Sequence, residues 1–112
     1  MRMWMIPPEK MCRKHLLGEH VELHMLAGHL FRKRNVGGFV KNNLIQVKDI
    51  SARHDEIAKE MIARGYQHSS PLMQPNVSFL SEEERCYEVD KKASNDDLIK
   101  RCSECRKKQA VI

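Results

Sequence analysis

The sequence has no apolar run longer than a few residues, whereas a helix that spans a bilayer needs about 20 consecutive apolar residues. Its start has no basic region followed by an apolar stretch and a small-residue cleavage site, so secretion is not supported. Internal repeats and low-complexity tracts are lacking as well. We therefore expect a cytoplasmic protein that does not associate with membranes.

The composition is that of an ordinary globular protein. Hydrophobic residues make up 41% of the 112 residues and charged residues 31%, which argues against a disordered chain. A chain of this length has room for one modest core, so we expect a single domain over residues 1–112.

Basic residues are in excess and are clustered. Lys and Arg outnumber Asp and Glu by 20 to 15. The clusters are "FRKR" at 31–34 and "KRCSECRKK" at 100–108. Such clusters favour a polyanionic partner, most commonly nucleic acid, although a solvated charged face explains the charge equally well.

Hydrophobic periodicity predicts an all-α fold of about three helices with long irregular connections. The first helix is expected from about Met11 to Phe31, and the prolines at 7 and 8 would allow an earlier start. Its apolar stripe contains Leu16, Leu23, Ala27 and Leu30. Its polar side contains His15, Glu19, Glu22 and His29. The segment "VKNNLIQV" has no clear period and is expected to be a loop.

Two further helices are expected. One runs from Asp49 to Arg64 and ends before Gly65. Its apolar positions are Ile50, Ile57, Ala58, Met61 and Ile62. The other is capped by Ser94, with Asp96 and Asp97 near its positive end. Its apolar stripe contains Leu98, Cys102 and Cys105. Residues 66–80 are rich in Ser, Pro and Asn and are expected to be irregular.

The cysteines and two of the histidines raise the question of a metal site. Without secretion the four cysteines are expected to be reduced. Cys102 and Cys105 form a CxxC pair that would be half of a zinc site, with Cys12 and Cys86 as the other half. Small thiols packed in a core explain the pair better.

The i, i+4 spacing of His20 and His24 suits a metal, but these residues lie toward the apolar stripe, where interior histidines are more common. We predict no metal and no other cofactor.

The segment "KHLLGEHVEL" at 14–23 resembles the central-helix motif of the pyrimidine-dimer DNA glycosylases, the phage endonuclease V family. That motif has the form His-Leu-x-x-Glu-x-x-Glu-Leu. Here it is matched by His15, Leu16, Glu19, Glu22 and Leu23. Weaker similarities are an Arg near the start, "AS" at 93–94 followed by Arg101, and "ARGY" at 63–66.

The resemblance implies a compact helical, phage-like enzyme that needs no metal and acts on double-stranded DNA as a monomer. If a phage encodes it, the site of action is the cytoplasm of the host cell. The implied mechanism uses the N-terminal α-amine to attack the sugar C1′, release the base and form an imine, followed by β-elimination. Glu22 is the implied proton shuttle, and His15 would face the sugar–phosphate.

Position 2 decides which amine would be the nucleophile. Removal of the initiator Met generally needs a small second residue, and here that residue is Arg2, so Met1 is expected to remain. The family's interval from nucleophile to catalytic glutamate is twenty-one positions, which equals the interval from Met1 to Glu22. An α-amine has an ordinary pKa of about 7.7–8.0 against about 10.4 for lysine, so it is the more available amine. The residues expected to contact DNA are Arg2, Lys14, Arg32, Lys33, Arg34 and Arg101.

Two departures from the family pattern leave alternatives open. Val21 and Met25 occupy positions where the family has arginines, and the tail lacks the family's aromatic residues. A changed base substrate or a lyase for abasic sites is therefore an alternative to a dimer-specific enzyme. A non-enzymatic DNA-binding module and a metal-dependent nuclease are the other two functions considered.

Overall fold

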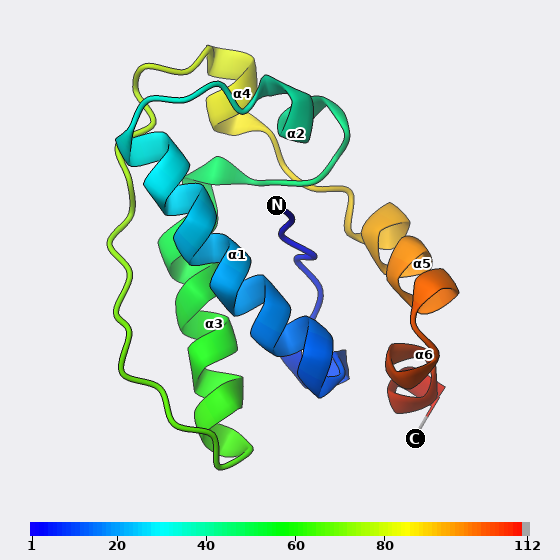
Figure 1. The fold of residues 1–112 in the computed structure, drawn as a ribbon. Helices are drawn as coiled ribbons and strands as arrows, with labels where there is room; N and C mark the ends of the chain where they lie inside the picture. Colours follow the sequence, from blue (N-terminus) through cyan, green and yellow to red (C-terminus); the bar gives the residue numbers. More distant parts are fainter. Residues whose placement is uncertain (111–112) are drawn as a thin grey trace.

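The computed structural model describes residues 1–110, which contain helices and irregular segments but no β-strand. Two long helices, α1 (Arg13–Phe31) and α3 (Ile50–Ala63), pack side by side at the centre (Figure 1). The shorter helices are α2 (Gly37–Lys41), α4 (Glu82–Cys86), α5 (Lys91–Arg101) and α6 (Ser103–Ala110). Two 3-10 turns, η1 (Pro8–Lys10) and η2 (Val47–Asp49), precede α1 and α3. The all-α prediction is confirmed.

The core lies between α1 and α3, on the faces that periodicity predicted. The four predicted apolar residues of α1 are buried, as are Ile50, Ile57 and Met61 of α3. Ile62 was wrongly placed on the buried face, since it is 61% exposed. Residues 66–80 form the predicted irregular connection, which runs along the outside of the α1–α3 pair (Figure 1).

The third predicted helix differs from the observed one. The helix begins at Lys91, because Asp90 and not Ser94 caps it by accepting a hydrogen bond from the Ala93 amide at 3.1 Å. It then breaks at Cys102, after which α6 begins. The expected loop at "VKNNLIQV" was also only partly right. Its first residues belong to α2, and Val40, Ile45 and Val47 are buried in the core.

The N-terminal segment is fixed along its length against three other parts of the chain. It runs beside α1 on the side of α5 and α6 (Figure 1). The Met3 amide donates to the carbonyl of Leu44 at 2.7 Å, and the hydroxyl of Ser94 donates to the carbonyl of Trp4 at 2.7 Å. Met3 and Trp4 are both buried. The first residues of the chain are therefore held at a defined place beside α1.

Candidate active site

An open cavity of about 730 Å³ lies between the N-terminal segment, α1 and the end of α5. Its volume falls in the range of roughly 300–1,000 Å³ that is typical of ligand sites. It is lined by Met1, Arg2, Trp4, Lys14, His15, Gly18, Glu19, Val21, Glu22, Leu44 and Arg101.

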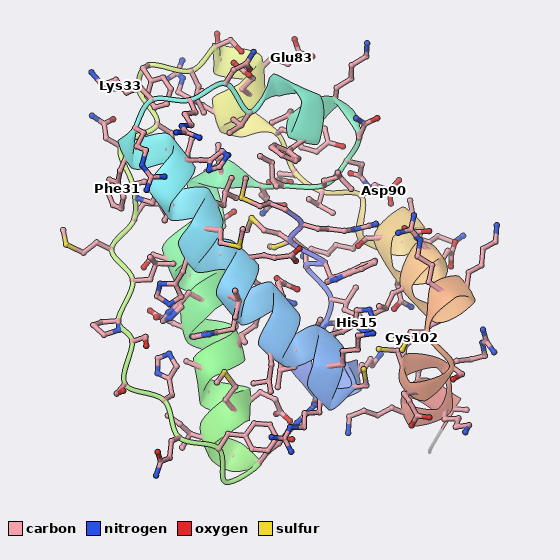
Figure 2. All side chains as sticks on the ribbon, in the orientation of Figure 1. His15, Phe31, Lys33, Glu83, Asp90 and Cys102 are labelled. Atoms are coloured by element: carbon pink, nitrogen blue, oxygen red, sulfur yellow. The ribbon has the colours of Figure 1, made fainter. Side chains whose placement is uncertain are left out.

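Six of the nine predicted site residues meet at this cavity. The N-terminal segment supplies Met1 and Arg2, α1 supplies Lys14, His15 and Glu22, and α5 supplies Arg101. The other three, residues 32–34, follow the opposite end of α1. Figure 2 labels His15 and Lys33 near the two ends of that helix. The cavity lining on α1 ends at Glu22, and the nine residues from there to Phe31 span about 14 Å, so these cations lie outside the cavity.

The face of α1 that lines the cavity follows from helical spacing. Lys14, Gly18 and Glu22 recur at intervals of four and therefore share one side of the helix. Gly18 has no side chain to fill the space, and a Cβ placed there would meet no atom within 4 Å. A glycine inside a helix is less stable than alanine by about 1 kcal/mol. At this position, the glycine leaves open space in the cavity between Lys14 and Glu22.

Glu19 was predicted on the polar side of the first helix, but the structure buries it completely. Its carboxylate accepts two hydrogen bonds from Arg53 of α3, from Nε at 2.6 Å and from Nη2 at 3.0 Å. It also accepts one from the Trp4 amide at 3.0 Å. Burial alone would lower the pKa of Arg53, but its hydrogen bonds and ion pair with Glu19 raise it. The pair thus fastens the N-terminal segment to α1 and α3 beneath the cavity.

Arg2 and Arg101 share one carboxylate at the other side of the cavity. Arg2 Nη1 lies 2.6 Å from Asp97 Oδ2, and Arg101 Nε lies 2.9 Å from Asp97 Oδ1. Partial burial would raise the pKa of Asp97, but the two arginines outweigh it and lower the pKa. The guanidinium of Arg2 also stacks on Trp4, 3.7 Å from the ring centroid. These contacts orient both arginines and neutralise part of their charge.

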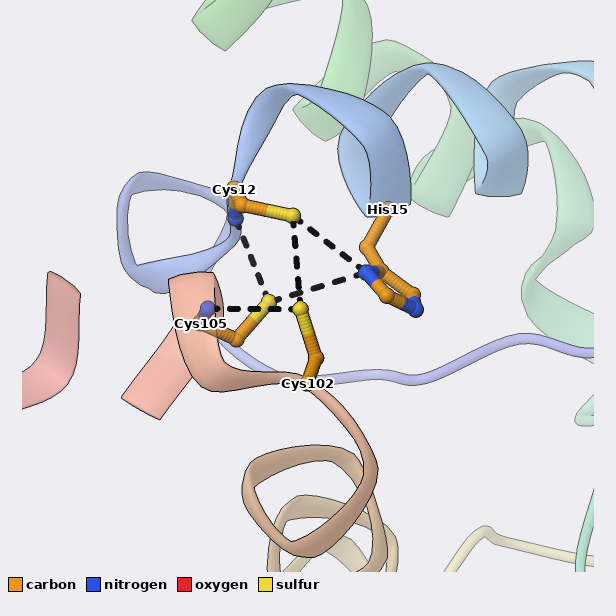
Figure 3. Close-up of side chains that lie close together, drawn as sticks. All are labelled: Cys12, His15, Cys102 and Cys105. Atoms are coloured by element: carbon orange, nitrogen blue, oxygen red, sulfur yellow. Dashed lines mark hydrogen bonds between the residues drawn. The ribbon is translucent and has the colours of Figure 1, made fainter. Parts of the chain in front are cut away.

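His15 borders the cavity and also a group of thiols. Its Nδ1 lies 3.3 Å from Cys12 Sγ and 3.8 Å from Cys105 Sγ, while the other ring nitrogen is turned away from the sulfurs (Figure 3). Burial, together with the positive charge of Lys14, lowers the pKa of His15. The neutral imidazole is therefore favoured near neutral pH.

The sequence reasoning missed several residues of the site. Asp97 was considered only for its place near a helix end, and Trp4 and Leu44 were not predicted to line a cavity. No local pattern indicates them, because their positions depend on contacts between segments more than 40 residues apart.

A family model of pyrimidine dimer DNA glycosylases matches residues 1–74. The chain belongs to this family. Comparisons with curated proteins and with solved structures find no match. The family's activity identifies DNA as the substrate and DNA repair as the setting. The match covers the motif in α1 but ends before α5, so Asp97 and Arg101 lie outside it. Among residues 1–110, no helix combines the length and the apolar character that crossing a bilayer requires.

Proposed function

We propose that this member of the pyrimidine-dimer glycosylase family is a DNA glycosylase with abasic-site lyase activity, and that the α-amine of Met1 is its nucleophile. The observation that carries the proposal is that Met1 and Glu22, which the family resemblance pairs, line the same cavity. Three cations line it with them, from the N-terminal segment, α1 and α5. An amine, a carboxylate and several phosphate-binding groups are what this reaction needs in one place.

The proposed chemistry begins when the neutral amine attacks C1′ of the damaged nucleotide. The N–C1′ bond forms as the glycosidic bond breaks, and the base leaves with the bonding electrons and takes up a proton. Ring opening at O4′ gives a protonated imine. Loss of a C2′ proton then expels the 3′ phosphate by β-elimination, and water releases the enzyme from the imine. Glu22 carries protons between these steps and stabilises the cationic sugar.

The proposed substrate is duplex DNA that contains a UV pyrimidine dimer, bound by a monomer of the protein. Exposing C1′ requires a nucleotide to leave the stack, which costs a few kcal/mol and least where the duplex is damaged. Arg2, Lys14 and Arg101 offset this cost by binding phosphates, and Nε2 of His15 contacts the sugar–phosphate. Val21 is 56% exposed beside them and adds an apolar contact.

The test is borohydride trapping with protein whose free N-terminus has been confirmed by mass. Duplexes with an abasic site, a cyclobutane dimer or no lesion are compared, and the adduct is mapped by peptide mass. An adduct on Met1 is expected with both lesions and not with the intact duplex. Protein acetylated at the N-terminus serves as the control and should not be trapped. An adduct on a lysine would overturn the assignment of Met1, and binding without any adduct would overturn the lyase in favour of a DNA-binding module.

A further inference from the structure

We propose that Cys12, His15, Cys102 and Cys105 bind one zinc ion that fastens the start of α1 to the α5–α6 junction. The four side chains come from two places far apart in the sequence and converge on one point (Figure 3). Their ligand atoms all lie within 4.8 Å of one another. The site shares His15 with the cavity, but it does not require the proposed function.

The distances fit tetrahedral zinc. With Zn–S of about 2.3 Å and Zn–N of about 2.0–2.1 Å, tetrahedral geometry places two sulfurs about 3.8 Å apart and a sulfur and a nitrogen about 3.6 Å apart. Cys12 Sγ and Cys102 Sγ are separated by 3.8 Å. The two distances from His15 Nδ1 to sulfur, 3.3 and 3.8 Å, lie on either side of the second value.

The spacing along the chain also fits zinc. Cys12 and His15 are separated by two residues, and so are Cys102 and Cys105, which gives the pattern C-x2-H…C-x2-C. Such pairs are typical of structural zinc sites. The first pair occupies the N-cap and first turn of α1, and the second joins the end of α5 to the first turn of α6.

Backbone amides near the sulfurs favour thiolates. The Cys12 amide donates to Cys105 Sγ at 3.3 Å, and the Cys105 amide donates to Cys102 Sγ at 3.4 Å. Amide hydrogen bonds to ligand sulfur are the kind of outer contact that orients metal ligands. Cys86 was considered as a ligand from the sequence, but it is exposed and is not in the group.

The site is closed, since four protein groups fill a tetrahedral shell and leave no position for water. Its role is therefore structural. Arg101, which lines the cavity, directly precedes Cys102, so the zinc holds one wall of the cavity in place. Zinc on Nδ1 of His15 also fixes the hydrogen on Nε2, which can then donate to a phosphate.

The test measures the metal content and the cobalt spectrum of the full chain, purified under reducing conditions without chelator. The cobalt-substituted wild type is expected to show intense thiolate-to-cobalt charge transfer and the visible bands of tetrahedral cobalt. Cys102→Ser should lose one equivalent of zinc and weaken the charge transfer, whereas Cys86→Ser should change neither. His15→Cys should keep the metal and strengthen the charge transfer. A fully reduced wild type that gives no thiolate–cobalt band would overturn the proposal, even if a variant fails to fold.

A second group of side chains points independently to another metal site. Nε2 of His68 lies 2.9 Å from Nε2 of His20 and 3.2 Å from Nε2 of His54. A ring nitrogen has one hydrogen or one lone pair in its plane, so His68 cannot satisfy both neighbours by hydrogen bonds. A cation at the centre satisfies all three. Tetrahedral ligation by imidazoles at about 2.0–2.1 Å separates the nitrogens by about 3.3 Å, close to the observed spacing.

Two further side chains lie beside this site. Nδ1 of His54 lies 3.0 Å from the carboxylate of Asp55, which is the usual outer partner of a metal-binding histidine. The ring of His24 lies 4.9 Å from that of His20 and 5.0 Å from that of His54, and its buried Nε2 has no partner within residues 1–110. We infer that His20, His54 and His68 bind a divalent transition-metal cation such as Zn²⁺, which joins α1, α3 and the 66–80 connection, with His24 beside the site.

Metal stoichiometry separates the two sites. Wild type is expected to hold two zinc ions per chain, His54→Ala or His68→Ala one, and His29→Ala two, because His29 lies on α1 but outside the group. In His54→Ala the thiolate–cobalt charge transfer should be unchanged. Equal zinc content in wild type and in folded His54→Ala and His68→Ala proteins would overturn the histidine site while leaving the thiol site standing.

Discussion

Glu19 and Arg53 form an ion pair in which both side chains are almost completely removed from solvent. Such a pair is costly to break, because the partner that remains is a buried, unpaired charge. We expect Glu19→Gln to lower the free energy of unfolding by about 3 kcal/mol or more. Denaturant titration measures the loss. Glu56→Gln is the matched control, because Glu56 also contacts Arg53 but is exposed, and its loss should cost less than about 1 kcal/mol. Equal effects would contradict the role given to burial.

Glu22→Gln is expected to remove catalysis and not binding. Loss of a general acid–base group lowers rates by about 10²- to 10⁴-fold, while the amide keeps the size of the side chain. Single-turnover strand cleavage and a binding titration on the same dimer-containing duplex measure the two effects. Glu9→Gln, outside the cavity, should cleave at the wild-type rate. A Glu22→Gln protein that cleaves normally would remove this residue from the mechanism.

Gly18→Ala is expected to stabilise the fold and impair the reaction. Replacing a glycine inside a helix with alanine stabilises it by up to about 1 kcal/mol, and the new methyl group meets no neighbour here. However, the new methyl group projects into the cavity that the substrate must enter, so it should hinder the reaction. The melting temperature of Gly18→Ala should therefore rise, while its rate of strand cleavage should fall. Gly38→Ala, in α2 and also without a close neighbour, should leave cleavage unchanged.

Alanine variants of cations at the two ends of α1 test whether the DNA duplex runs along this helix or crosses it. If the DNA runs along this helix, both Lys14 and Arg34 contact phosphates. Each alanine variant should then reduce the slope of log K against log salt by about 0.9. Lys59→Ala on α3, outside the α1 cavity, is the control and should leave the slope unchanged. An effect of Lys14→Ala alone would mean that the duplex crosses α1 at the cavity end.

Asp97→Asn is expected to tighten DNA binding severalfold, because Arg2 and Arg101 lose the carboxylate that competes with phosphate.

The same variant tests how the stability of the fold depends on pH. The pKa of Asp97 is lowered in the folded protein, so its contribution to stability is present above its ordinary pKa of 3.8 and is lost as the pH falls through the folded value. The stability difference between wild type and Asp97→Asn should therefore narrow below about pH 4. A difference that stays constant there would contradict the ion pair.

The long helices were predictable because each buries a stripe that recurs at helical spacing. The roles of Ser94 and Glu19 were predicted wrongly because their partners are distant in sequence. Ser94 has the chemistry of a cap, yet it donates to the carbonyl of Trp4, 90 residues away. Glu19 has the spacing of a polar face, yet Arg53 of another helix draws it into the core. Local rules favour a helix cap for Ser94 and a polar face for Glu19, because such rules contain no tertiary partner.

The two groups of side chains proposed to bind metal were only partly recognisable in the sequence. The equal spacing of Cys12–His15 and Cys102–Cys105 was present, but the zinc site considered from the cysteines alone combined the CxxC pair with Cys12 and Cys86 and left out His15. The i, i+4 histidines on α1 suggested a ligand pair, but nothing in the sequence indicated that His54 and His68 would fold against them. Ligand sets assembled from three segments can be recognised only when the packing of those segments is known.

The hydrogen bond from the Met3 amide to the carbonyl of Leu44 anchors the backbone two residues after Met1, and so limits how far the Met1 amine can reach. Met1 and Arg2 lie between this hydrogen bond and the proposed nucleophilic amine, and each added residue would extend the chain by up to about 3.6 Å. A single residue left by a cleaved purification tag would move the terminal amine by more than a hydrogen-bond length. The proposed nucleophile therefore depends on the position of the Met1 amine relative to the Met3–Leu44 hydrogen bond, which no interior substitution can restore.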